Sequence, residues 1–80
     1  MNIQQKLITI LNDKGIYIEE SEIVTDVELE INSLTFISVV LAIENNFDIM
    51  IPDQYMVLEE LNTFPKILSM INSVLKADTV

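Results

Sequence analysis

The sequence predicts an all-α protein, a small four-helix bundle with three longer helices and one short helix. Half of the 80 residues are apolar, but only three Phe, two Tyr and no Trp are present, so the core must consist mostly of Ile, Leu and Val. Apolar residues also recur at helical spacing in three stretches of the chain. We expect one domain, 1–80, because a core of this size is near the lower limit for folding by hydrophobic burial alone.

The first helix is predicted over residues 2–13. Gly15, the single glycine of the chain, stands where a left-handed residue would end this helix. Four apolar residues give the helical spacing: Ile3, Leu7, Ile10 and Leu11.

A long packed loop is predicted from Ile16 to Ile31. This stretch mixes apolar residues with six acids and has no sustained helical period, although Val27, Leu29 and Ile31 alternate. A strand is an alternative, but a lone strand has no partner for its hydrogen bonds, which favours a loop or a single helical turn.

The second helix is predicted from Ser33 to Asn46, because Asn32 and Ser33 are N-cap residue types before a periodic apolar run. Alternating apolar residues in 47–52 indicate an extended connector that ends at Pro52.

A short third helix is predicted over 53–61, and a last helix follows after Asn62 and Thr63, which can cap it. Pro65 is tolerated in its first turn, where the backbone N–H has no partner to lose. The buried stripe of this helix is expected to comprise Phe64, Ile67, Leu68, Ile71 and Leu75. Three methionines are expected to fill gaps in the core: Met50, Met56 and Met70.

The composition narrows the possible functions. The chain has no Cys and no His, so it lacks thiolate nucleophiles, disulfides and the commonest general base and metal ligand, which argues against an enzyme. Four Lys, no Arg and thirteen acids give a net charge of −9, which would repel nucleic acid and anionic membrane surfaces. No apolar stretch is long enough to insert into a membrane, and no signal peptide is recognisable, so we expect a soluble, cytoplasmic monomer.

The second helix has two apolar stripes. One spans about 100° of the helix, as expected of a core-facing stripe, and comprises Phe36, Val39, Val40, Ile43 and Phe47. The other lies beside Ser33 and Glu44 and comprises Leu34, Ile37 and Leu41. Exposed apolar residues next to acids are typical of a docking surface. The alternative is that the second stripe packs against the first helix or the long loop.

Two segments together form a longer pattern, Leu29-Glu30-Ile31-Asn32-Ser33-Leu34 and then Ala42 to Asp53, with its sequence Ala-Ile-Glu-Asn-Asn-Phe-Asp-Ile-Met-Ile-Pro-Asp. Their residues and spacing resemble the acyl carrier and peptidyl carrier protein family, here as a freestanding protein. That resemblance implies a four-helix bundle of acyl-carrier type. It also implies that Ser33 receives a 4′-phosphopantetheine arm from coenzyme A, which then holds an acyl or aminoacyl group as a thioester.

The resemblance implies a set of partners as well. These are a phosphopantetheinyl transferase, a ligase that loads the acyl or aminoacyl group, and a downstream transferase or synthase. Docking is expected through Asn32, Leu34, Ile37, Leu41 and Glu44. The protein would then be a non-catalytic substrate of these enzymes.

The chain departs from the family at the residues around the serine. Glu30, Ile31 and Asn32 replace the usual Gly, small or apolar residue and Asp, and Thr35 and Ser38 stand where acids are usual. These changes favour a specialised pathway, such as nonribosomal peptide, polyketide or D-alanyl-type transfer, over primary fatty-acid synthesis. The alternative function is an acidic helical interaction module that has no prosthetic group.

Overall fold

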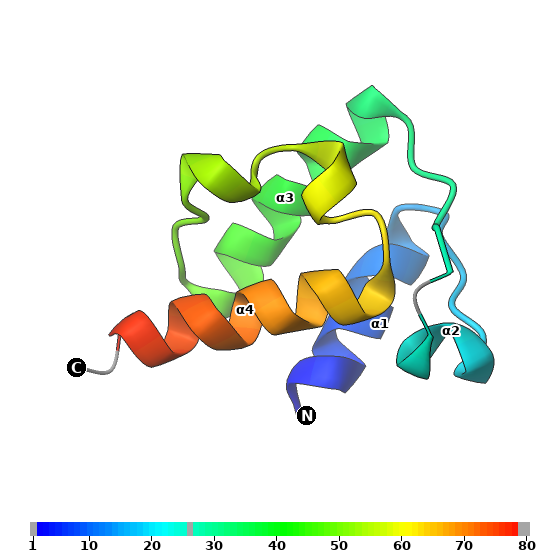
Figure 1. The fold of residues 1–80 in the computed structure, drawn as a ribbon, viewed down its shortest axis with the longest axis horizontal. Coiled ribbons are helices and arrows are strands. Elements are labelled where there is room, and N and C mark those ends of the chain that lie inside the picture. Colours follow the sequence, from blue (N-terminus) through cyan, green and yellow to red (C-terminus); the bar gives the residue numbers. More distant parts are fainter. Residues whose placement is uncertain (1, 26, 79–80) are drawn as a thin grey trace.

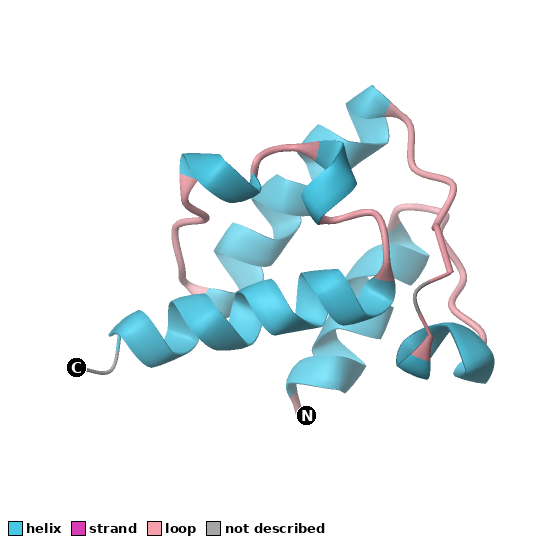
Figure 2. Cartoon of the chain, viewed as in Figure 1, coloured by secondary structure: helices cyan, strands magenta, loops and turns pink. Residues whose placement is uncertain are grey.

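The structure is a computed structural model that describes residues 2–25 and 27–78. These residues form four α-helices and two short 3₁₀ turns joined by loops. The helices are α1 (Ile3–Asp13), α2 (Glu20–Val24), α3 (Ser33–Phe47) and α4 (Phe64–Asp78), and the turns are η1 (Asp53–Tyr55) and η2 (Leu58–Glu60). Those residues contain no strand (Figure 2). The prediction of an all-α bundle with three longer helices and a short one is confirmed.

The three long helices surround one apolar core. α1 packs against α3 and α4, and α2 packs against α4. In Figure 1 the two 3₁₀ turns lie between the end of α3 and the start of α4, and α2 lies at the side of the bundle. The most completely buried side chains come from the long helices and the segment before α4, and include Leu7, Leu11, Ile43, Leu61, Phe64 and Ile71.

α1 forms as predicted, and both of its ends have local causes. The Asn2 side chain caps the helix by accepting a hydrogen bond from the Gln5 backbone N–H at 2.8 Å. Gly15 has a φ of 84°, so it occupies the left-handed region that ends the helix. Its backbone N–H donates to the Asn12 carbonyl at 3.0 Å.

α3 begins at Ser33 as predicted and ends one residue later than predicted. Phe47 belongs to the helix and not to the extended connector, because Asp48 adopts the left-handed conformation (φ 53°, ψ 50°) and terminates the helix there. Beyond Asp48 the predicted alternation holds. Ile49 and Ile51 are buried, whereas Met50 between them is 84% exposed.

The short helix lies elsewhere than the sequence indicates. Residues 53–61 form η1 and η2 instead of one α-helix, and the short α-helix is α2, inside the predicted long loop. α2 is stabilised locally, because the Glu22 carboxylate accepts a hydrogen bond from the Glu19 backbone N–H at 2.9 Å. A five-residue helix is too short to produce a recognisable apolar period, which explains why the sequence does not reveal it.

α4 is capped by Thr63, whose hydroxyl oxygen accepts a hydrogen bond from the Lys66 backbone N–H at 3.3 Å. Pro65 lies in the first turn, as predicted. Within the predicted stripe Phe64, Ile67 and Ile71 are buried and Leu68 and Leu75 are half-buried. Two further buried side chains of α4 were not predicted as part of that stripe: Met70 and Val74.

None of the helices formed by residues 2–25 and 27–78 is both long enough and apolar enough to cross a membrane.

Candidate functional site

Ser33 is the first residue of α3, and its side chain is exposed. The cap of this helix is made by its neighbour, because the Asn32 Oδ1 atom accepts a hydrogen bond from the Thr35 backbone N–H at 2.8 Å. The Asn32 carbonyl accepts a second one from the Phe36 N–H, also at 2.8 Å. No hydrogen bond among the described residues involves the Ser33 hydroxyl. Ser33 is therefore not required to cap the helix.

The second apolar stripe of α3 is exposed. Leu34 is 82% exposed, and Ile37 and Leu41 are each 54% exposed. Of the five residues predicted to face the core, Phe36, Val39, Val40 and Ile43 are nearly inaccessible, and Phe47 is half-buried against the core. Since more than half of each stripe residue is accessible to solvent, packing against the first helix or the long loop does not cover this stripe. Its proposed part in docking stays a prediction.

Glu44 is half-buried on the α3 face that it shares with Ser33. Its Oε2 atom accepts a hydrogen bond from the Ile51 backbone N–H at 2.9 Å. The Glu44 carbonyl accepts another from the Ile49 N–H at 3.1 Å. Glu44 thus fastens the connector after α3 to the helix, a structural role that its sequence position does not reveal.

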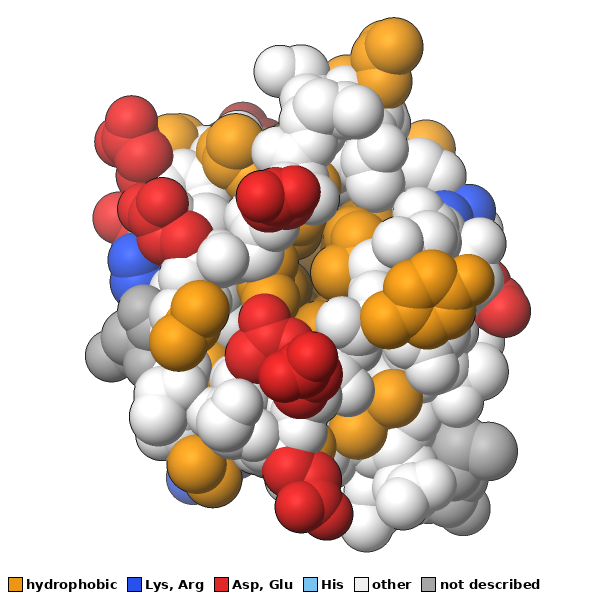
Figure 3. All heavy atoms as spheres, turned by 90° about the vertical axis from the view of Figure 1, so that its right-hand side faces the viewer, with side chains coloured by type: hydrophobic (Ala, Val, Ile, Leu, Met, Phe, Trp, Pro, Cys, Tyr) orange, Lys and Arg blue, Asp and Glu red, His pale blue; other side chains and the backbone are white. Residues whose placement is uncertain are grey.

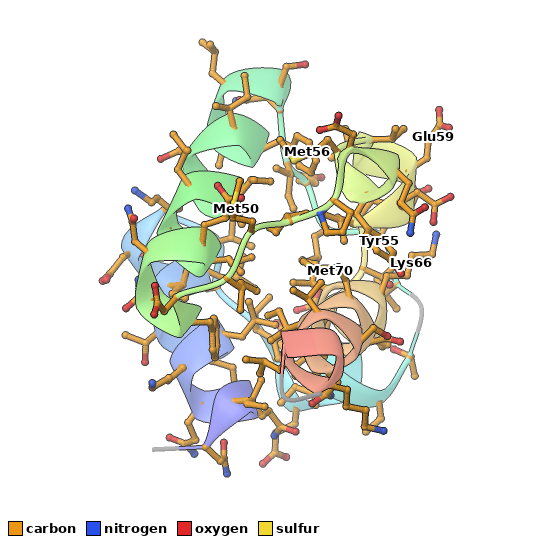
Figure 4. All side chains as sticks on the ribbon, turned by 90° about the vertical axis from the view of Figure 1, so that its left-hand side faces the viewer. Met50, Tyr55, Met56, Glu59, Lys66 and Met70 are labelled. Carbon is orange, nitrogen blue, oxygen red and sulfur yellow. The ribbon has the colours of Figure 1, made fainter. Side chains whose placement is uncertain are left out.

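The segment that leads to Ser33 is fastened to the start of α4 through Asn62. The Asn62 carbonyl accepts a hydrogen bond from the Leu29 N–H at 2.8 Å, and its Nδ2 donates to a Glu28 carboxylate oxygen at 3.2 Å. The Lys66 ammonium donates to Asn62 Oδ1 at 3.2 Å and to the Glu59 carbonyl at 2.9 Å (Figure 4). Asn62 therefore joins the long loop to α4 instead of capping that helix, which Thr63 does.

Two of the methionines expected in the core lie at the surface. Met50 and Met56 are exposed, whereas Met70 is buried, and Figure 4 shows the three coming from the connector, the segment after η1 and α4. Val57, next to Met56, is exposed as well. Apolar surface is thus present on the segment after α3 in addition to the stripe on the helix. The alternation of 47–52 already sets Met50 opposite Ile49 and Ile51, but neither a period-2 nor a period-3.6 pattern could reveal the exposure of Met56 and Val57, because η1 and η2 are too short for either.

The charges of the chain are strongly segregated along the sequence. Eleven of the thirteen acids lie between residues 19 and 60, and the four lysines lie outside that range, at positions 6, 14, 66 and 76. On the face that presents α2 and the long loop, acidic side chains alternate with apolar ones (Figure 3). No group of three or more His, Cys, Asp or Glu side chains in the described residues is arranged to hold a metal ion.

Comparisons of the chain with protein-family models, with curated proteins and with solved structures find no match.

Proposed function

We propose that this protein is a carrier in which the Ser33 hydroxyl holds a 4′-phosphopantetheine arm, and that the arm delivers a thioester-bound acyl or aminoacyl group to partner enzymes. The observation that supports this most directly is the state of Ser33. It lies exposed at the start of a fifteen-residue helix, while Asn32 supplies the helix cap. The serine hydroxyl is therefore accessible and has no competing structural task.

The position of Ser33 suits the chemistry of attachment. A transferase moves the phosphopantetheine group from coenzyme A when the serine oxygen attacks the β-phosphorus, which forms a phosphodiester and releases adenosine 3′,5′-bisphosphate. In-line attack needs an unhindered hydroxyl. The negative charge of the product would lie near the first backbone N–H groups of α3, at the positive end of the helix dipole.

A chain without Cys and His is compatible with the carrier function. The arm supplies the thiol that forms the thioester, so the protein itself needs neither Cys nor an acid–base pair. A chain without Cys and His can therefore serve thioester chemistry as a substrate of other enzymes. Those enzymes would be a phosphopantetheinyl transferase, a loading ligase and a downstream transferase or synthase.

The surface around Ser33 favours a specialised pathway over primary fatty-acid synthesis. Thr35 and Ser38 are uncharged, and α3 carries a single acid, Glu44, whose carboxylate is already hydrogen-bonded to the connector. Recognition would then depend more on the exposed stripe of Leu34, Ile37 and Leu41 than on charge along the helix. Nonribosomal peptide, polyketide and D-alanyl-type systems are the candidate pathways.

A second candidate function is an acidic helical interaction module without a prosthetic group. The exposed stripe favours it, because a surface of this kind can bind a partner whether or not Ser33 is modified. Only the carrier function requires that Ser33 be modified.

Intact-mass measurement distinguishes them. After incubation with coenzyme A and a broad-specificity phosphopantetheinyl transferase, the wild-type mass should rise by one phosphopantetheine group. Ser33→Ala should abolish the gain, and Ser73→Ala, which removes an exposed serine from α4, should leave it unchanged. The absence of any gain with several transferases, for a protein that is folded by circular dichroism, would contradict the carrier function and favour the interaction module.

A further inference from the structure

The exposed stripe of α3 has two different borders. On the side that Ser33 and Glu44 share, the helix is joined to the connector by the Glu44–Ile51 hydrogen bond. On the other side Ala42 and Asn46 face α1, where they help to line a groove of about 380 Å³. Successive residues of an α-helix are about 100° apart, which places Leu34, Ile37 and Leu41 between these two borders.

The α1 border is basic. Two of the four lysines in the protein, Lys6 and Lys14, line the groove together with Thr9 and Asp13. The Lys6 ammonium lies 5.5 Å from the centroid of the Phe47 ring, so a cation–π contact fixes it beside the end of α3. Lys14 has no ion pair with another described residue.

The connector border is acidic. Asp48 ends α3, Asp53 begins η1, and both side chains are exposed. Glu59 and Glu60, in η2, are exposed too, but they lie beside Lys66, whose ammonium donates to the Glu59 carbonyl, so they do not add to this border. The sequence has no lysine between positions 15 and 65, and Asp48 and Asp53 form no ion pair with another described residue.

We infer that the stripe and its two borders form one polarised docking surface. The partner element that fits it has an apolar centre for Leu34, Ile37 and Leu41, basic side chains along the connector border, and a carboxylate that enters the groove between Lys6 and Lys14. The inference rests on the proposed function, because that function requires a partner to dock near Ser33. The docking surface itself does not require the phosphopantetheine arm.

Charge complementarity would set the orientation of a partner on this surface. A net charge of −9 attracts any basic surface, and such attraction speeds encounter without fixing orientation. A positive border opposite a negative one makes one orientation favourable and the reversed one repulsive. The two lysines would therefore determine in which direction a partner element lies along α3, and so where Ser33 points.

The test uses unmodified Ser33→Ala protein and two synthetic helical peptides with the same Leu-rich apolar face. One peptide has Lys along one edge of that face and Glu along the other, and the second has Lys along both edges. Their affinities are measured by fluorescence anisotropy at physiological salt, and the contacted amides are identified by NMR chemical-shift mapping.

The double variant Lys6→Gln/Lys14→Gln is expected to affect the two peptides in opposite directions. The mixed-charge peptide should bind about fivefold more weakly, since each exposed ion pair contributes up to about 1 kcal/mol. The all-Lys peptide should bind more tightly, because the variant removes two repelling charges. A matched control, Asn72→Asp/Ser73→Asp, makes the same change in net charge on the exposed side of α4 and should leave the mixed-charge peptide unaffected.

Three results would overturn the inference. The first is that neither peptide binds α3, and the second is that the lysine variant leaves the mixed-charge peptide unaffected. The third is a concentration-dependent self-association in sedimentation that the lysine variant abolishes, because it would make a second copy of the chain the occupant. Binding is measured without the arm, so the two proposals can fail separately. If the mixed-charge peptide binds as expected but no transferase modifies Ser33 of the wild-type protein, the carrier function is rejected and the docking surface is retained.

Discussion

The two apolar faces of α3 contain similar residues and have opposite surroundings. Val39, Val40 and Ile43 are almost inaccessible, whereas Leu34, Ile37 and Leu41 are exposed on the same helix. The difference shows that the hydrophobicity of α3 exceeds what the fold requires. In a small domain, where every buried side chain contributes a large share of a modest stability, exposed Leu and Ile on a central helix contribute little to folding. The proposed docking of a partner would give these exposed residues a role that the fold does not.

The largest difference between the faces should appear in stability. Ile43→Ala removes a fully buried side chain and should lower the free energy of unfolding by about 2–5 kcal/mol. Leu41→Ala, on the exposed face, should change it by less than about 1 kcal/mol. Urea denaturation followed by circular dichroism measures both. If Ile43→Ala leaves the protein without a folded baseline, Ile43→Val, with an expected loss of about 0.5–1.5 kcal/mol, gives the measurable value. Similar losses for the Ala variants at positions 41 and 43 would contradict the distinction between the faces.

The next largest effect should appear in docking. Leu41→Glu should lower kcat/KM for modification of Ser33 by about tenfold, because a charge would enter an apolar contact worth roughly 1–1.5 kcal/mol. Its stability should remain near that of the wild type, since the side chain is more than half exposed. Asn72→Glu, an exposed α4 variant with the same change in net charge, serves as the control. An unchanged kcat/KM for Leu41→Glu would remove the stripe from the docking surface.

The smallest effect concerns the boundary between the faces, where Glu44 fastens the connector. Glu44→Leu removes the acceptor for the Ile51 N–H and should cost about 1 kcal/mol, with amide hydrogen exchange accelerated at Ile51. Glu44→Gln keeps a side-chain oxygen acceptor and should cost less. If Glu44→Leu loses neither stability nor protection at Ile51, the carboxylate does not hold the connector, and a direct role in partner contact would be favoured.

Much of the fold was accessible from the sequence because its causes are local. The cap residues Asn2 and Asn32, the left-handed Gly15 and the 3.6-residue period of the long helices each act over a few neighbouring residues. The same locality explains why α2 was predicted only as part of a loop or a single helical turn, and why 53–61 was predicted as one helix. In segments of three to five residues, contacts with the rest of the protein override weak local preferences.

Like the fold, the candidate site has some features that the sequence predicts and others that depend on contacts between distant residues. The sequence placed Ser33 at a helix start and identified the second stripe of α3, but it left open whether that stripe is covered. It also could not assign the cap to Asn32 alone, the Glu44 carboxylate to the Ile51 N–H, or Asn62 to the loop before Ser33.

The sequence by itself determined the helical class, the position of Ser33 and the segregation of charge, because each depends on residue type and spacing along the chain. The tertiary structure decided which apolar face of α3 meets solvent and which charges border it. Those outcomes depend on how α1, the connector and α4 pack around α3, and that packing joins residues far apart in the sequence, such as Leu29 with Asn62 and Lys6 with Phe47.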